Sequence, residues 1–309
     1  MTGQKIVVLG TGGTIAGRAS NAGDNLGYTA AQVGVAQLLH DVAPLRDVKI
    51  ESEQVSQIDS KDMDADVWRA LAVRCAHWLA QPDVQGIVVT HGTDTLEETA
   101  YFLHAVLDPA KPVVITCAMR PSTALVPDGP QNLLDAVAVA RTSGARGVVA
   151  VCAGTVHAAR DVAKVHPYRL DAFGSGDAGP LGYVEEGVVR QLKPWPAEAS
   201  LVAIGQVVAA RHWPRVEIVM SHAGAGSGLV DVLVAQKVDG IVVAGTGNGT
   251  LHHVLEASLL KAQAAGVRVV RSSRCPEGRV LATPHDALPD STGLSPVKAR
   301  IALMLGLLG

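Results

Sequence analysis

Apolar runs and amphipathic stretches alternate along most of the chain. The runs at residues 86–90 and 147–154 are almost continuously apolar, which is typical of strands buried on both faces of a parallel sheet. The stretches between such runs carry their apolar residues at helical spacing. This alternation predicts repeated β-α-β units.

The predicted elements form two groups. In the first group we expect strands at residues 5–10, 48–55, 86–91, 112–119 and 147–153, and helices at 30–42, 62–81, 95–107 and 131–142. A polar, glycine-containing stretch at residues 155–187 then favours hairpin and loop. In the second group we expect strands at 216–221, 240–244 and 267–271, and helices at 229–236, 252–265 and from residue 296 onward.

The length of the chain favours two domains, because 309 residues exceed the size at which one hydrophobic core usually stops growing. We expect an N-terminal α/β catalytic domain at residues 1–192, a linker at 193–214 and a C-terminal α/β domain at 215–309. The larger domain should hold a mostly parallel sheet with helices on both faces. The smaller domain should hold a second parallel sheet.

Composition favours a globular protein that binds a small molecule. Apolar residues make up 48% of the chain and charged residues 18%, as in a protein with a large buried core. The net charge is -3 at pH 7 and no run of Lys or Arg occurs, so neither nucleic acid nor a membrane is expected as a partner.

The cysteines and the N-terminus predict a cytoplasmic location. Four cysteines are scattered along the chain, and Cys117 and Cys152 lie in apolar runs that predict buried strands, so we interpret them as free core residues in a reducing compartment. The chain passes from Met1 into its first predicted strand with no charged leader or long apolar segment.

Three loops that follow predicted strands carry polar residues. The carboxyl ends of parallel strands meet at one edge of a sheet, where ligands bind. Thr14 lies in the glycine-rich turn after the first strand, Ser60 follows the second strand as a predicted helix cap, and Thr93 and Asp94 follow the third. We therefore expect the hydroxyls of Thr14 and Thr93 and the carboxylate of Asp94 near one another.

Two of these loops also have a competing interpretation. The glycine-rich turn resembles a dinucleotide fingerprint, but the third glycine of that motif would fall at Ile15. In the third loop, Thr93 or Thr95 suits a helix cap and Asp94 suits a first-turn charge. Two hydroxyl-bearing loops on neighbouring strands instead favour acyl transfer.

Longer motifs extend along nearly the whole chain. The two most specific are TGGTIAG at residues 11–17 and THGTDTLEETAYFL at 90–103. Others are AMRPS (118–122), DGPQNLLDAV (128–137), ARDVAK (159–164), GPLGY (179–183), DGIVVAGTGNG (239–249) and RSSR (271–274). Together they resemble the motifs of the bacterial-type L-asparaginases, the glutaminase-asparaginase family.

The resemblance implies that Thr14 is the nucleophile, with Tyr28 beside it on the loop between the first strand and helix. It also implies a second polar group of Thr93, Asp94 and Lys164. A threonine hydroxyl needs a base or a polarising network to take its proton, and a desolvated lysine near a carboxylate suits that network. Tyr28 and Lys164 both stay candidates for the proton acceptor.

The same resemblance implies the substrate contacts. Ser60 is expected on the α-carboxylate and Asp94 on the α-ammonium, and each group suits the charge it meets. Ala118 is implied as a further substrate-binding residue. Asn248 is implied to reach the active site of a neighbouring subunit, so a homo-oligomer, a dimer of dimers, is expected.

Two departures from the family pattern bear on substrate choice. Lys61, at a substrate-binding position, stands where many members carry a glutamine. Between Arg274 and Pro296 the chain has no match for a glutamate that longer members contribute from an adjacent subunit. Both departures predict a preference for asparagine over the longer glutamine.

The resulting interpretation is an amidohydrolase that converts L-asparagine to L-aspartate and ammonia through an acyl-enzyme. No cofactor is expected, and no metal, because motifs such as H-E-x-x-H and C-x-x-C do not occur. Two alternatives stay open: a glutaminase-type amidotransferase subunit that supplies ammonia to a partner, and an amino-acid-binding sensor without turnover.

Overall fold

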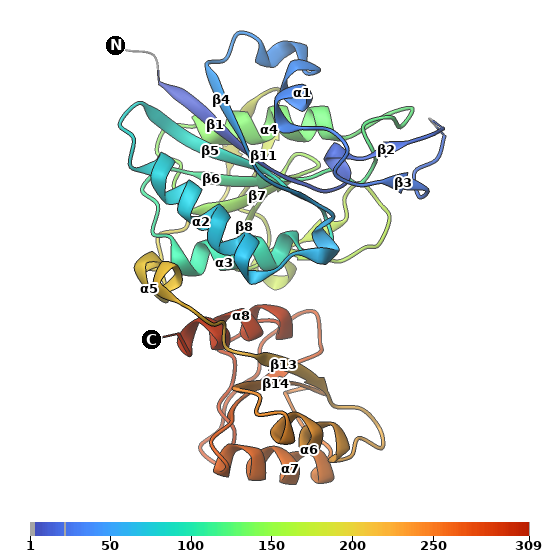
Figure 1. Ribbon diagram of the computed structural model, residues 1–309, viewed down its shortest axis with the longest axis vertical. Coiled ribbons are helices and arrows are strands. Elements are labelled where there is room, and N and C mark those ends of the chain that lie inside the picture. The colour runs from blue at the N-terminus through green and yellow to red at the C-terminus, as the bar shows by residue number, and fades with distance from the viewer. Residues whose placement is uncertain (1–3, 22, 309) are drawn as a thin grey trace. The chain divides into compact units, whose positions relative to one another are not determined.

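The computed structural model describes residues 4–21 and 23–308, and its chain forms two compact units, one ending at Ser200 and one beginning at Leu201 (Figure 1). Each unit has its own parallel sheet and its own hydrophobic core. The predicted α/β class, with a larger mostly parallel sheet followed by a smaller parallel one, is confirmed.

The first unit is built on an eight-stranded sheet in the order β12-β11-β8-β7-β6-β5-β1-β4. Strands β7, β6, β5, β1 and β4 run parallel, and β8, β11 and β12 continue the sheet in antiparallel pairs. The strands are β1 (Lys5–Gly12), β4 (Ile50–Ile58), β5 (Val84–Thr90), β6 (Val113–Thr116), β7 (Val148–Cys152), β8 (Thr155–Ala158), β11 (Gly182–Glu185) and β12 (Val188–Gln191).

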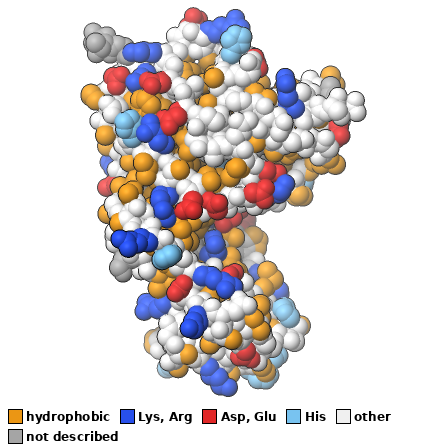
Figure 2. All heavy atoms as spheres, in the orientation of Figure 1, with side chains coloured by type: hydrophobic (Ala, Val, Ile, Leu, Met, Phe, Trp, Pro, Cys, Tyr) orange, Lys and Arg blue, Asp and Glu red, His pale blue; other side chains and the backbone are white. Residues whose placement is uncertain are grey.

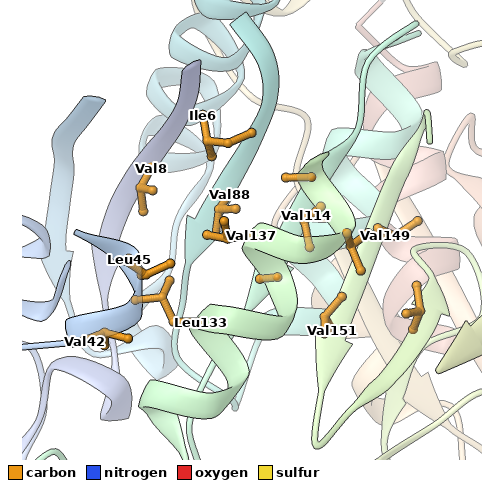
Figure 3. Close-up of a cluster of buried hydrophobic side chains, with 14 of the residues drawn as sticks. Ile6, Val8, Val42, Leu45, Val88, Val114, Leu133, Val137, Val149 and Val151 are labelled. Atoms are coloured by element: carbon orange, nitrogen blue, oxygen red, sulfur yellow. The ribbon is translucent and has the colours of Figure 1, made fainter. Parts of the chain in front are cut away.

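Helices cover both faces of this sheet (Figure 1). They are α1 (Val35–His40), α2 (Ala65–Leu79), α3 (Leu96–Val106) and α4 (Gly129–Arg141). On one face, Leu133 and Val137 of α4 share a buried cluster with Val88 and Val114 of the sheet (Figure 3). Helices α2 and α3 pack together on the other face. Burial on both faces explains the continuous apolar runs of the central strands.

The second unit repeats this arrangement on a smaller scale. Its sheet has the order β13-β14-β15, all parallel, with strands β13 (Val216–Met220), β14 (Gly240–Gly245) and β15 (Arg268–Ser273). Its helices are α5 (Ile204–Ala209), α6 (Gly228–Ala235), α7 (His253–Ala264) and α8 (Pro296–Gly306). Alternate residues of β14 face different helices: Ile241 and Val243 join the cluster of α6 and α7, whereas Gly240 lies against Leu303 of α8.

Two short antiparallel pairs lie outside the eight-stranded sheet of the first unit. One pairs β2 (Arg18–Ala19) with β3 (Tyr28–Thr29), and the other pairs β9 (Ala163–Lys164) with β10 (Phe173–Gly174). Four 3-10 turns complete the elements: Thr14–Ala16, Ala43–Leu45, Ser60–Asp62 and Gly176–Ala178. Tyr28 and Lys164, both site candidates, therefore lie on regular backbone.

Some predicted boundaries are wrong. The helix expected at 30–42 begins only at Val35, because Gly34 is extended and Ala31 has a φ of 56°, which an α-helix does not tolerate. The helix expected from residue 62 begins at Ala65, where the Asp64 carboxylate accepts from two backbone N–H groups. Helix α5 lies inside the segment that we expected to be a linker.

The face of the molecule in Figure 2 carries charges of both signs. On the face drawn in Figure 2, Lys and Arg side chains are interspersed with Asp and Glu. In the part of the chain that the structure describes, every helix is too short or too polar to cross a membrane.

A backbone contact between Gly13 and Gly92 joins the loops after β1 and β5. A Cβ atom on Gly13 would lie 2.2 Å from the Gly92 Cα and 2.3 Å from the Gly92 nitrogen. Gly13 also has a φ of 80°, in the left-handed region that favours glycine. Only glycine at this position lets the two loops touch.

Replacing Gly13 by alanine should therefore destabilise the fold. We expect Gly13→Ala to lower the free energy of unfolding by at least about 2 kcal/mol more than Gly144→Ala does, measured by urea denaturation. Gly144 is the matched control because its φ is 76° but a Cβ there would meet nothing within 4 Å. Equal losses in the two variants would show that the loop contact adds nothing to the backbone strain.

Candidate active site

The loops after β1, β4 and β5 meet at one edge of the first sheet. The Gly13 N–H donates to the Ile58 carbonyl at 2.9 Å, and the Thr11 hydroxyl donates to the Thr90 carbonyl at 3.0 Å. The contact between Gly13 and Gly92 closes the third side. Residues that follow these anchors directly along the chain are thus held at the same edge.

Thr14 is the first residue of a 3-10 turn and is buried, with 6% of its surface exposed. Its Oγ1 lies 2.6 Å from the phenolic oxygen of Tyr28, a distance at which either group can donate. Gly17 lets the ring approach, because a Cβ there would lie 2.8 Å from the Tyr28 ring. The structure thus brings this predicted pair into hydrogen-bond contact.

A second polar group forms around Lys164. Its Nζ donates to Thr93 Oγ1 at 2.9 Å and to Asp94 Oδ1 at 2.7 Å. The Lys164 side chain is only 17% exposed, whereas that of Asp94 is 53% exposed. The backbone N–H of Lys164 donates to the Glu97 carboxylate at 3.3 Å, and this bond holds Lys164 against α3. The lysine therefore differs from an ordinary solvated surface lysine.

Ser60 lies beside this group. The prediction that Ser60 caps the following helix is wrong. The cap of α2 is Asp64, and the carboxylate of Asp59 accepts from the N–H of Lys61. The Ser60 hydroxyl instead accepts from the Asp94 N–H at 3.2 Å, and Thr95 donates its hydroxyl to the Ser60 carbonyl at 2.7 Å. These bonds tie the loop after β4 to the loop after β5.

Lys61 turns back on its own loop. Its Nζ lies 2.7 Å from Asp59 Oδ2, and its side chain is 64% exposed. The hydrogen bond to Asp59 raises the pKa of Lys61, with a smaller contribution from the charge of Asp94. The lysine is thus a charged, solvated neighbour of Ser60.

His91 is buried directly behind the site, with 0% exposed. Its Nδ1 lies 2.7 Å from the Gly92 carbonyl and its Nε2 lies 2.9 Å from the Thr99 hydroxyl. Thr99 in turn accepts from the indole N–H of Trp68 at 2.8 Å. Burial lowers the pKa of His91 to about 4, so the imidazole is neutral at pH 7.

Ala118 lies fully buried just after β6. In the same loop the Asp128 carboxylate accepts from the N–H groups of Met119 and Arg120, both at 2.9 Å. Asn132 donates to the Cys117 carbonyl at 2.9 Å. Asp128 and Asn132 were not singled out by the sequence reasoning, although the motif at 128–137 contains both.

Asn248 belongs to the second unit, between Gly247 and Gly249, which have φ values of 46° and 76°. Both ends of its amide pair with the backbone of Leu281: Nδ2 donates to the carbonyl at 3.1 Å and Oδ1 accepts from the N–H at 2.7 Å. Its observed contacts therefore lie within its own unit. Among residues 4–21 and 23–308, no group of three or more His, Cys, Asp or Glu side chains could hold a metal ion.

A buried threonine hydroxyl beside a phenol, and a second beside a lysine and a carboxylate, are groups that suit nucleophilic acyl transfer. Residues 5–196 match the family model "Asparaginase, N-terminal", and residues 215–308 match "Glutaminase/Asparaginase C-terminal domain". The chain belongs to the asparaginase family of amide hydrolases.

Individual relatives are similar to this chain over almost its full length. L-asparaginase 2 of Escherichia coli (strain K12) is 41% identical, covering 98% of this chain and 88% of the relative. Glutaminase-asparaginase of Pseudomonas fluorescens biotype A is 36% identical over 98% and 86%. The crystal structure of a probable cytoplasmic L-asparaginase from Campylobacter jejuni is 38% identical, has a TM-score of 0.93 and covers 98% of this chain and 95% of its own.

The neutral state of His91 makes stability depend on pH. A histidine in the unfolded chain has a pKa of about 6.5, whereas the pKa of His91 in the folded protein is about 4. Between these two pH values the unfolded chain binds a proton at His91 and the folded protein does not. Stability from this residue is therefore lost as pH falls. Between pH 7 and pH 5 the wild type should lose about 2 kcal/mol more than His91→Leu, measured by urea denaturation. Equal losses would show that His91 has the same pKa in the folded protein as in the unfolded chain.

Proposed function

We propose that this chain hydrolyses the side-chain amide of L-asparagine to L-aspartate and ammonia, with Thr14 as the nucleophile. The observation that carries the proposal is the pair of threonine hydroxyls at one sheet edge, one bonded to Tyr28 and the other to Lys164. Family membership and the names of the relatives support the same reaction.

The first half-reaction forms an ester. Thr14 Oγ1 attacks the amide carbon as its proton leaves, and collapse of the tetrahedral intermediate breaks the C–N bond and releases ammonia with a proton delivered to its nitrogen. Tyr28 is one candidate for the first proton, since its oxygen lies 2.6 Å from Thr14 and can pass its own proton on. Lys164 is the other, but an ammonium only donates, so it must first lose a proton.

The second half-reaction adds water to the ester and returns the proton to Thr14. The group of Thr93, Lys164 and Asp94 suits the activation of that water, because it offers a hydroxyl, an amine and a carboxylate within hydrogen-bond distance of one another. Backbone N–H groups at Thr14 and Thr93 are candidates for stabilising the oxyanion in both halves, a contribution of roughly 3 to 4 kcal/mol per donor in other enzymes.

The substrate's charged ends have matching groups. Ser60 already accepts from the Asp94 N–H, so its own proton is left to donate to the α-carboxylate. Asp94 bonds Lys164 through Oδ1 and is half exposed, so its second oxygen suits the α-ammonium. Ala118 would contribute only the wall of the pocket, because it has no polar side-chain atom.

We expect Thr14→Ala to lower turnover by at least about a thousandfold while aspartate still binds within about threefold of the wild-type affinity. The variant loses the nucleophile but keeps the contacts assigned to Ser60 and Asp94. Ammonia release measures the first quantity and calorimetric titration the second. Thr142→Ala is the control, because that hydroxyl bonds only its own helix.

Near-normal turnover in Thr14→Ala would move the nucleophile to Thr93. Loss of both turnover and aspartate binding would instead assign Thr14 to the structure of the pocket.

We further propose that asparagine is preferred over glutamine, with a ratio of kcat/KM above about tenfold, since one methylene is worth only about 1 to 3 kcal/mol. The charge of Lys61 beside Ser60 should disfavour the repositioning that the longer glutamine needs. Lys61→Gln should therefore raise kcat/KM for glutamine more than for asparagine in the ammonia-release assay. Equal values for the two amides in the wild type would contradict the preference, and an unchanged ratio in Lys61→Gln would exclude this lysine as its cause.

Three further proposals concern organisation. Residues 1–192 would form the catalytic domain and 215–309 the C-terminal domain, as the family models support. A dimer of dimers would let Asn248 serve a neighbour's site. A cytoplasmic location is supported by the free, buried thiols of Cys117 and Cys152, although relatives carry both cytoplasmic and periplasmic names.

A further inference from the structure

His91 lies in a chain of hydrogen bonds whose direction is fixed at every link. The indole N–H of Trp68 can only donate, so the Thr99 hydroxyl accepts from it. The Gly92 carbonyl can only accept, so His91 Nδ1 carries the proton. With Nδ1 protonated, the neutral imidazole has only Nε2 left as an acceptor, so the Thr99 hydroxyl donates to Nε2 and one neutral tautomer is defined.

At one end of this series of hydrogen bonds, His91 Nδ1 bonds the carbonyl of the peptide between Gly92 and Thr93. The His91 backbone is itself fixed, because its N–H donates to the Thr116 carbonyl of the neighbouring strand at 2.8 Å. In a planar trans peptide the C=O and N–H point in opposite directions. A carbonyl drawn toward the buried imidazole thus turns the Thr93 N–H away from the core.

The Thr93 N–H has no hydrogen-bond partner among the residues that the structure describes, whereas the next N–H, of Asp94, donates to Ser60. The loop that carries it touches the Thr14 turn through Gly13 and Gly92. An unused backbone donor beside a nucleophile is the kind of group that stabilises an oxyanion.

We infer that His91, supported by Thr99 and Trp68, is a positioning residue that aims the Thr93 N–H at the carbonyl oxygen of the reacting amide. The inference rests on the proposed amide hydrolysis and assigns His91 no proton transfer. A buried imidazole suits the role because it offers a donor to Gly92 and an acceptor to Thr99 without introducing a charge.

Two replacements of nearly equal shape separate positioning from packing. In His91→Asn the side-chain amide can still donate to the Gly92 carbonyl, and in His91→Leu nothing can. We expect His91→Leu to lower kcat about a hundredfold and His91→Asn by less than about tenfold, with KM within about threefold in both. The free energy of unfolding of His91→Leu should be at least as large as that of His91→Asn, because leucine buries no polar group. The order of kcat is then not the order of stability.

If kcat instead follows the melting temperature across these variants, or if leucine and asparagine reduce kcat equally, the inference is overturned. Thr99→Val and Thr99→Ser provide a second comparison, in which serine should keep kcat within about threefold and valine should lower it at least about tenfold. Thr142→Val is the matched control, because its hydroxyl bonds a carbonyl of its own helix, that of Ala138.

A spectroscopic readout separates this inference from the proposed function. In protein labelled with ¹⁵N-histidine, the His91 resonances, assigned by their loss in His91→Asn, should show a proton on Nδ1 at pH 7 in the wild type and in Thr99→Ser. A proton on Nε2 would overturn the inference whatever the activity. Absence of amide hydrolysis in a wild type with the Nδ1 proton would overturn the proposed function and leave the hydrogen-bond chain established.

Discussion

The close approach of two glycine backbones, Gly13 and Gly92, is the constraint on which the site depends. Thr14 and Thr93 each follow one of these glycines, so the positions of both hydroxyls are set by backbone contact between two strand ends. The strands that precede these glycines, β1 and β5, pair with each other and are buried on both faces. The proposed site is thereby built at the ends of buried strands, and Tyr28 and Lys164 come to it from the short pairs β2-β3 and β9-β10.

Around this contact the charged side chains lie near the surface and the buried histidine is neutral. Lys164 and Asp94 form an ion pair at the edge of the site, where Asp94 is half exposed and can meet a charged substrate. Deeper in the fold, His91 supplies polarity without charge, because burial lowers its pKa to about 4. This order keeps the desolvation cost of an ionised group away from the core, while the neutral imidazole still bonds the Gly92 carbonyl beside Thr93.

Topology explains why part of the site was predictable. Alternating apolar runs indicated parallel strands, and parallel strands bring their carboxyl ends together, so Thr14, Ser60 and Thr93 were expected at one edge. Local competition explains the errors: Asp59 caps the 3-10 turn that contains Ser60 and Asp64 caps α2, so the capping role expected of Ser60 falls to its neighbours. Lys164 was named only through family resemblance, because a lysine on a two-residue strand carries no signal of its own. The hydrogen-bond chain of His91 depends on side-chain contacts between three elements, which no local pattern encodes.

The most direct test of the account is to identify the residue that becomes acylated. Enzyme mixed with asparagine, quenched in acid within a single turnover and digested, should yield a peptide containing Thr14 that carries one aspartyl ester, detected by mass spectrometry. The same peptide from Thr14→Ala should be unmodified. An aspartyl ester on the peptide that contains Thr93, with none on that containing Thr14, would contradict the account.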